Sequence, residues 1–505
     1  LGRKMAPTFD RSDGDDAADG GRAEVWEYFL CYEAWKAAYG AYDVMDAAAA
    51  IFAVIRDVGY PGPRIDEVYV DEVQDFTQAE LRLFLACCAD PNAVFLTGDT
   101  CQTIARGVGF RFDDITTMFF HLREAQAARL KAEGRTLAEG DCVQVPEVNK
   151  LSTNYRTHNG ILGAASELVS LLLALFPASV DALAKDRGHF DGPRPLLLSR
   201  STPDDLAILL VGSDPSHSQI EFGAHQAVLV RSQASKERLP AAFANALVLT
   251  IFEAKGLEFD DVFIFDFFED SPADERTWRV VTGCDGSGAA AAAGGATADA
   301  TDEEAAWAAQ IGGAPRAEAF DRQRHALLNE ELKMLYTAVT RARVKVIIYD
   351  SSTEKRRPLF HFLLKKRLAS LWNSSEGGEA QGVAARSTPA EWAARARNLM
   401  ENKLFEYASS CYEKAGDEVG MLRAMAYDLY QRAVGAGGRD ALAPAQPLSA
   451  AARRDYLLRA ARCFAQLPDG CLLAARCCRE AGEHQLAAAA FRALGKPAKA
   501  AKALA

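Results

Sequence analysis

Short runs of apolar residues alternate with stretches of helical periodicity over residues 24–125, and the same style returns over residues 145–350. Candidate strands lie at 67–70 and 93–96 in the first part, and at 227–230, 246–249, 262–265 and 345–349 in the second. Strands that alternate with helices form parallel sheets covered by helices. We therefore expect an α/β fold with one parallel sheet in each part.

From about Pro389 onward the pattern becomes entirely helical and rich in alanine. Segments 408–417 (ASSCYEKAGD) and 474–483 (AARCCREAGE) resemble each other, and their matching residues Cys411 and Cys477 lie 66 positions apart. That spacing is close to twice the roughly 34-residue tetratricopeptide period. The pattern predicts an all-α tail of helical repeats that binds a protein partner. A plain alanine-rich helical bundle is the alternative.

Composition completes the division of the chain. A stretch rich in glycine and alanine, at about 282–316, predicts a disordered insertion within the second sheet domain. We expect a first sheet domain over residues 1–125 and a second over 126–350. A connector over 351–388 then leads to tetratricopeptide-like repeats over 389–505.

The bulk properties are those of a globular chain of 505 residues, with 49% hydrophobic and 25% charged residues. The net charge of -12 gives no sign of a basic nucleic-acid-binding surface, although a narrow basic channel is compatible with it. The 11 cysteines form no CxxC pair, which favours free thiols in a reducing compartment and no zinc site.

The apolar runs point to no membrane partner. No apolar signal core opens the chain, and the run 168–176 is too short to cross a bilayer. We predict a soluble intracellular protein, and the choice between nucleus and cytoplasm stays open.

An acidic motif, VDEVQD over residues 70–75, ends the first candidate strand. Carboxylates at the carboxyl end of a parallel strand face the crevice where ligands bind. A metal-bound nucleotide needs an acidic Mg²⁺ ligand and a base that orients water, and Asp71 and Glu72 fit these roles. Alone, such a string would more often be a solvated loop.

A second motif, TGDTCQ over residues 97–102, repeats the design of strand, glycine turn and polar groups about 25 residues later. Here Gln102 is placed to sense a terminal phosphate. The alternative is a turn followed by a helix cap.

Three further motifs follow: NYRTH at 154–158, TIFEAKGLEF at 250–259 and LYTAVTRAR at 335–343. The planar guanidinium of arginine binds two oxygens at once and suits a developing phosphoryl charge, which makes Arg156 and Arg341 candidates. A lone arginine is more often a surface residue.

The order DExQD, GDxxQ, NYR, TxxxAKGLEF and YTAVTRAR resembles motifs II to VI of the UvrD-like superfamily 1 helicases, over about residues 24–350. The likeness is greatest to eukaryotic members fused to tetratricopeptide and ankyrin repeats. The resemblance implies two RecA-like domains, the first of them incomplete here, that sandwich ATP with Mg²⁺ and step along single-stranded DNA or RNA.

By this resemblance, Asp71 holds Mg²⁺, Glu72 activates the attacking water and Gln102 couples the γ-phosphate to movement. Arg156 and Arg341 act as arginine fingers on the same phosphate.

The resemblance also implies residues that bind the cofactor: Gly256 near the phosphates, Glu258 at the ribose, and Gln74. Tyr155 is expected to pack locally.

The chain departs from the family in having no G-x-x-x-x-G-K-[ST] phosphate-binding loop, and its Gly495–Lys496 pair precedes proline in the tail. That loop supplies backbone donors and a lysine to the phosphates. We expect a fragment that begins downstream of the loop, with a dead motor as the alternative. The chain alone is not expected to hydrolyse ATP efficiently.

Two other departures concern the nucleic-acid track. Only 19 positions separate Arg231 from Thr250, which leaves no room for the family's 2B domain. Where relatives carry base-stacking aromatics, the chain has Ala105 and Gly107.

The candidates for nucleic-acid contact are therefore Phe110, Phe112, Thr250 and Lys255. Core packing is an equal alternative for the two phenylalanines. Phe252 stands where many relatives carry histidine. Two functions remain open: an ATP-driven helicase or translocase, and a non-catalytic scaffold whose helical repeats bind a protein.

Overall fold

A computed structural model describes residues 18–104, 109–134, 142–182, 185–198, 223–284, 307, 310–372, 387–435, 448–496 and 499–500. The chain divides into two compact units. Unit 1 comprises residues 1–98 and 114–145, and unit 2 comprises 99–113 and 146–505. Most of the predicted insertion at 282–316 lies outside the described residues, as do Ala105 and Gly107.

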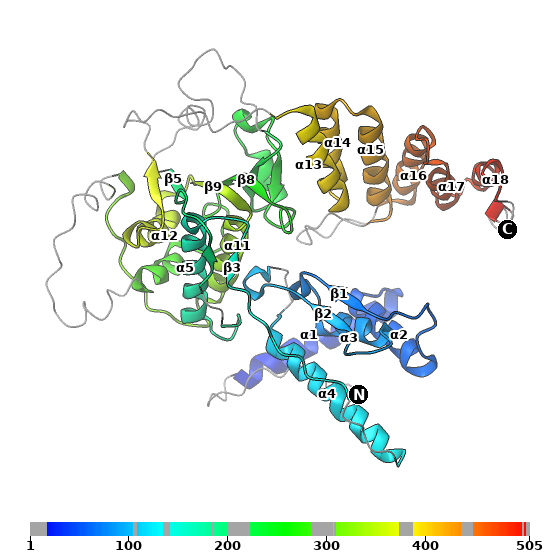
Figure 1. Ribbon diagram of the computed structural model, residues 1–505, viewed down its shortest axis with the longest axis horizontal. Helices are drawn as coiled ribbons and strands as arrows, with labels where there is room; N and C mark the ends of the chain where they lie inside the picture. Colours follow the sequence, from blue (N-terminus) through cyan, green and yellow to red (C-terminus); the bar gives the residue numbers. More distant parts are fainter. Residues whose placement is uncertain are drawn as a thin grey trace. The chain divides into compact units, whose positions relative to one another are not determined.

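Unit 1 holds a two-stranded parallel sheet of β1 (Val68–Val70) and β2 (Val94–Leu96), shown in blue in Figure 1. Both strands fall where the apolar runs predict them. On one face, the rings of Tyr69 and Phe95 lie 6.0 Å apart and are 72% and 60% exposed. Parallel sheets are normally covered on both faces, so the described part of unit 1 leaves this face open.

The helices of unit 1 are α1 (Ala18–Tyr39), α2 (Val44–Val58), α3 (Gln78–Cys87) and α4 (Phe112–Ala132), the last of which begins two residues inside unit 2. In addition, a short 3-10 helix, η1 (Val73–Asp75), follows β1.

The side chain of Lys36 joins α1 to α2. Its Nζ lies 2.7 Å from Glu33, 2.9 Å from Asp43 and 2.7 Å from Asp46. The hydrogen bond from Lys36 lowers the pKa of Asp43 to about 2. These three carboxylates are close enough together to hold a cation, but the ammonium group already occupies the place between them.

Unit 2 is built on a parallel sheet in the order β10-β5-β9-β8-β6-β7. Its strands are β5 (Leu196–Leu198), β6 (Gln226–Val230), β7 (Val248–Thr250), β8 (Phe259–Phe265), β9 (Ala342–Tyr349) and β10 (Ser370–Trp372). A smaller pair, β3 (Thr153–Asn154) and β4 (Arg187–Gly188), is also parallel. The predicted parallel α/β architecture is therefore confirmed for this part of the chain.

Helices cover the sheet: α5 (Asn159–Leu175), α7 (Gln233–Glu237), α8 (Glu275–Arg279), α11 (Ala326–Val339) and α12 (Thr353–Lys365). The short 3-10 helices are η2 (Thr100–Gln102), η3 (Ala241–Phe243) and η4 (Val280–Cys284).

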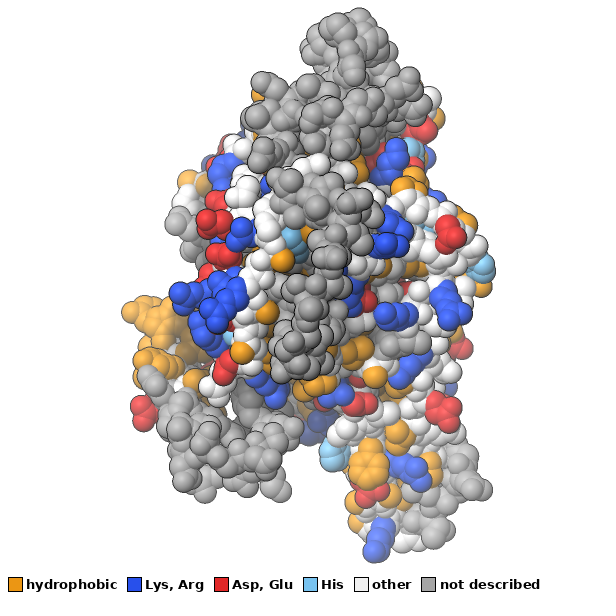
Figure 2. Space-filling view, turned by 90° about the vertical axis from the view of Figure 1, so that its left-hand side faces the viewer, with side chains coloured by type: hydrophobic (Ala, Val, Ile, Leu, Met, Phe, Trp, Pro, Cys, Tyr) orange, Lys and Arg blue, Asp and Glu red, His pale blue; other side chains and the backbone are white. Residues whose placement is uncertain are grey.

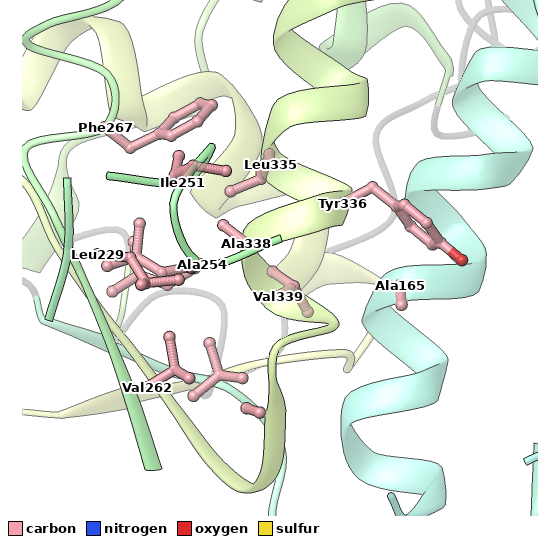
Figure 3. Close-up of a cluster of buried hydrophobic side chains, with 14 of the residues drawn as sticks. Ala165, Leu229, Ile251, Ala254, Val262, Phe267, Leu335, Tyr336, Ala338 and Val339 are labelled. Atoms are coloured by element: carbon pink, nitrogen blue, oxygen red, sulfur yellow. The ribbon is translucent and has the colours of Figure 1, made fainter. Parts of the chain in front are cut away.

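Alternate residues of β6 face opposite sides of the sheet, as the two-residue period of a strand requires. Leu229 belongs to the larger core, whereas Val228 and Val230 belong to a smaller cluster. In the larger core, Leu229 and Ile251 lie opposite Ala338 of α11 (Figure 3).

The tail consists of α13 (Pro389–Glu401), α14 (Phe405–Ala415), α15 (Glu418–Ala433), α16 (Ala450–Ala465), α17 (Cys471–Glu480) and α18 (His484–Ala493). Each helix packs against the next, as the gold-to-red part of Figure 1 shows. The two similar segments occupy equivalent positions, because α14 and α17 are each followed within two residues by a glycine of positive φ, Gly416 at 72° and Gly482 at 80°.

The larger core of unit 2 continues without a break into the tail. Trp392 and Leu399 of α13, Ala408 and Tyr412 of α14, and Ala424 of α15 are buried in the same cluster as the sheet residues. The first tail helices therefore share the core of unit 2.

Among the described residues, no single helix is both long and apolar enough to cross a membrane. The pair Val25–Tyr39 and Val44–Val58 meets the criteria of length and composition only when taken together, with a bend of 75° between its halves.

Candidate functional site

The acidic motif follows β1 directly. Asp71 Oδ1 accepts hydrogen bonds from Thr97 Oγ1 at 2.6 Å and from the Glu72 amide at 2.9 Å. Thr97 is in place because Val70 pairs with Leu96 in parallel register, so the next residues of both strands meet. Glu72 has φ 51° and ψ 43°, a left-handed conformation that is sparsely populated by residues with side chains and that clusters at functional sites.

Gln74 and Gly98 bring the first two motifs into contact. The amide of Gln74, which is fully buried, donates to the Glu72 carboxylate. A Cβ at Gly98 would overlap with the Gln74 amide oxygen and would lie 2.9 Å from a Val73 methyl group. The glycine of the GDxxQ motif is therefore needed for close approach to the acidic motif.

The rest of the GDxxQ motif belongs to unit 2. Asp99 caps η2 by accepting from the Cys101 amide, and its other oxygen accepts from the Tyr336 hydroxyl, each at 2.9 Å. Cys101 and Ile104 are buried in the core of unit 2. Residues 99–104 and 109–113 therefore belong to the same unit as the second predicted sheet domain, which was expected to begin at residue 126.

Arg341 lies at the centre of three motifs and is 2% exposed. Its Nη2 donates to Gln102 Oε1 at 2.8 Å, its Nε to the Thr337 carbonyl at 3.0 Å and its Nη1 to the Leu257 carbonyl at 3.4 Å. Lys255 donates to the Gln102 carbonyl at 2.9 Å. Gln102 and Arg341, two of the three residues predicted to act on the γ-phosphate, are thus hydrogen-bonded to each other.

Arg156 and Glu258 form a second pair of predicted nucleotide residues, with Nε and Oε1 2.6 Å apart. Both side chains are partly exposed, at 44% and 38%. The backbone that presents Arg156 is shaped by Asn154 Oδ1, which accepts from the Arg156 amide at 2.9 Å. The loop that presents Glu258 turns at Gly256, where φ is 79°.

Tyr155 is 80% exposed, and its ring centroid lies 4.5 Å from that of His189.

The four residues predicted to contact nucleic acid are mostly buried. Thr250 Oγ1 accepts from the Glu253 amide at 3.2 Å, and Lys255 is bonded to Gln102. Phe110 is buried edge-on against Phe112, with the ring centroids 5.3 Å apart. Phe110 thus has the core-packing role that was the alternative to nucleic-acid contact.

Glu253 is a central residue of this region that motif analysis did not single out. Its carboxylate accepts from the Thr250 amide at 2.7 Å and from Lys236, and the Tyr407 hydroxyl donates to it at 3.1 Å. It lies within the predicted motif TIFEAKGLEF. The T-x-x-E spacing of Thr250 and Glu253 is a local signal for their reciprocal hydrogen bonds. No local signal marks Tyr407 as a partner, because it is 154 positions away.

Figure 2 shows one face of the molecule, on which a group of Lys and Arg side chains lies at the left and others stand further right, with Asp and Glu side chains near both.

Two comparisons with known proteins agree with this geometry. Residues 228–353 match the family model of the UvrD-like helicase C-terminal domain. This range begins inside β6 and contains β7 to β9 and α11, and with them Glu258 and Arg341. This part of the chain is therefore similar to a UvrD-like helicase C-terminal domain, and the predicted resemblance to that family is confirmed here.

The chain is also 37% identical over 439 residues to the human TPR and ankyrin repeat-containing protein 1. The match covers 85% of this chain and 14% of the human protein. The chain thus spans a small part of its relative's length, and the likeness to repeat-bearing relatives that the motifs suggested is confirmed.

Proposed function

We propose that the protein is part of an ATP-dependent helicase or translocase that acts on single-stranded DNA or RNA. The observation that carries the proposal is the Arg341–Gln102 hydrogen bond, since it joins two motifs 239 positions apart that both suit a terminal phosphate. The matching UvrD-like C-terminal domain supports the same assignment. In this proposal both sheet domains are RecA-like, and α13 to α18 are tetratricopeptide-like repeats.

The residues of unit 1 suit Mg²⁺ and water. Asp71 is exposed, and only one of its carboxylate oxygens is used in the hydrogen bonds from Thr97 and Glu72. Oxygen ligands of this kind are those that Mg²⁺ prefers. We propose Asp71 as the Mg²⁺ ligand and Glu72, held by Gln74, as the base that orients water.

The residues of unit 2 suit the phosphates. We propose that Gln102, Arg341 and Arg156 contact the γ-phosphate, and that Gly256 and Glu258 contact the rest of the nucleotide. Each arginine already bonds to an oxygen of the protein, so a phosphate oxygen would replace Gln102 or Glu258 as its partner. Such a replacement would couple nucleotide binding to a local rearrangement.

The test uses the longest natural form of the protein that contains this chain. We expect ATPase activity stimulated by single-stranded nucleic acid, and we expect Glu72→Gln to lower kcat by about 100-fold or more, because water loses its base. Asp75→Asn, in the same motif, is the matched control and should keep activity within about threefold.

Binding of a fluorescent ATP analogue should survive in Glu72→Gln. Full hydrolysis by that variant would overturn the role of Glu72. If the longer wild-type protein neither bound nor hydrolysed ATP, the proposed function itself would be wrong.

A second candidate function is a non-catalytic scaffold whose helical tail binds a protein. The observation in its favour is that Arg341, at 2% exposed, has its guanidinium bonded to four protein oxygens. The scaffold predicts no ATP binding by the longer protein, so measured hydrolysis would exclude it.

A further inference from the structure

The first tail helix contacts the predicted nucleotide loop, residues 250–259, through Arg395. Its Nη2 donates to the Glu258 carbonyl at 3.1 Å, and its Nε donates to the Ala224 carbonyl at 2.7 Å. The guanidinium also lies over the ring of Phe259, 4.5 Å from the centroid. One side chain of α13 therefore holds the end of the loop, the start of β8 and the residues before β6.

The second tail helix holds the other end of the same loop through Tyr407. Its hydroxyl donates to both oxygens of Glu253, at 3.1 and 3.2 Å. Lys236 bonds to the same carboxylate and lies 4.9 Å from the Tyr407 ring centroid. Glu253 in turn accepts from the Thr250 amide, so Tyr407 acts on the turn that opens the loop.

These polar contacts stand beside a hollow in the junction. A pocket of about 350 Å³ is lined by Gln233, Lys236 and Val248 of the sheet domain and by Trp392, Tyr407 and Lys414 of the tail. The pocket interrupts the apolar packing between the sheet domain and α14. The position of loop 250–259 relative to α14 therefore depends more on individual hydrogen bonds. The hydrogen bond to a buried carboxylate is the stronger kind, because its acceptor is charged.

Glu258 connects the tail to Arg156 through two different groups. The Glu258 carbonyl bonds to Arg395 of the tail, while the Glu258 side chain bonds to Arg156. The tail thus contacts the backbone of the same residue whose side chain is paired with a predicted arginine finger.

We propose that α13 and α14 are a positioning element for loop 250–259, with Arg395 and Tyr407 as the positioning residues. They fix the loop in the conformation that presents Glu258 to Arg156. Anything that displaces these helices then alters the loop. The significance for catalysis rests on the proposed function, whereas the positioning itself does not.

The experiment compares amide hydrogen exchange in the full chain with that of Tyr407→Phe. This variant removes one hydroxyl and keeps the buried ring. The amides of Ala254 and Leu257, which bond to the carbonyls of Thr250 and Ala254, report on the loop. We expect them to exchange about tenfold faster, while the amides of β6 keep their rates.

Tyr430→Phe is the matched control, because the Tyr430 hydroxyl bonds to Glu480 within the tail. It should leave the exchange of the loop unchanged.

A second pair of variants tests the other end of the loop. Arg395→Met should raise exchange over residues 257–259, and Arg395→Lys, which keeps the charge, should restore part of the protection. Arg423→Met is the control, since Arg423 pairs with Asp469 inside the tail.

Two results would overturn the proposal. One is wild-type exchange of the loop in both Tyr407→Phe and Arg395→Met, and the other is an equal rise throughout unit 2. Neither measurement uses a nucleotide, so a failure of the proposed ATPase function would be seen separately.

Discussion

Arg231 and Glu331 form a two-pronged ion pair inside unit 2. The two N–O distances are 2.7 and 2.6 Å, and the side chains are 9% and 3% exposed. The Ser271 hydroxyl donates to the same carboxylate at 2.6 Å, and the Arg231 guanidinium lies 4.8 Å from the Phe267 ring centroid. Such a pair offsets the desolvation of its charges only while both partners are present.

We expect Glu331→Leu to lower the free energy of unfolding by about 3–5 kcal/mol, because it leaves the Arg231 charge buried and unpaired. The double variant Arg231→Met/Glu331→Leu should regain most of this loss. Urea unfolding followed by circular dichroism measures both.

The exposed Arg423–Asp469 pair is the control, since Asp469→Ala should cost less than about 1 kcal/mol. Equal losses in the single and the double Arg231/Glu331 variants would contradict the expectation.

At the scale of elements, the ends of α14 and α17 depend on glycine. Gly416 and Gly482 have φ of 72° and 80°, and a Cβ at either position would meet nothing within 4 Å. The need for glycine here is therefore conformational and not steric. This differs from Gly98, where a Cβ would meet the buried Gln74 side chain.

We expect Gly416→Ala and Gly482→Ala each to destabilise the tail by about 1 kcal/mol, because a side chain disfavours the left-handed conformation. Thermal unfolding of the full chain measures the shift. Gly313→Ala is the control, as that glycine has equal space and no positive φ. A loss in Gly313→Ala as large as in the other two would show that the effect is not conformational.

At the scale of the whole molecule, the two units differ in how much apolar surface they bury. In unit 1, the aromatic side chains along α1 remain exposed, among them Trp26, Tyr28, Trp35 and Tyr39. In unit 2, the strands β6 and β8 are almost completely buried. Burial of apolar surface is the main contribution to folding stability. The described part of unit 1 therefore gains less stability from it than unit 2 does.

We expect unit 1 to open more readily than unit 2. The Thr97 amide bonds to the Val70 carbonyl across β1 and β2, and the Ile251 amide bonds to the Val230 carbonyl in the large sheet. The Thr97 amide should exchange at least about 100-fold faster than that of Ile251 in native-state hydrogen exchange. Equal protection of the two amides would show that the units unfold together.

The sequence by itself determined the strands β1, β2 and β6 to β9, the helical nature of the tail and the order of the motifs, whereas β3, β4, β5 and β10 were not predicted. The apolar run at 227–230 became β6, and the repeat segment at 408–417 became the end of α14 and its turn. These features are local, because the periodicity of a strand or helix depends on residues that are close together in the sequence. Glycine at 98 and 256 could likewise be singled out within motifs a few residues long.

Only the tertiary structure decided which motif residues meet. Gln102 bonds to Arg341 at a separation of 239 positions, and Tyr407 bonds to Glu253 at a separation of 154. Residues 99–104 belong to unit 2 because Cys101 and Ile104 are buried in its core, although in the sequence they directly follow the motif that ends β2. Such contacts depend on how elements that are distant in the sequence pack together, and this packing cannot be predicted from the residues next to each motif.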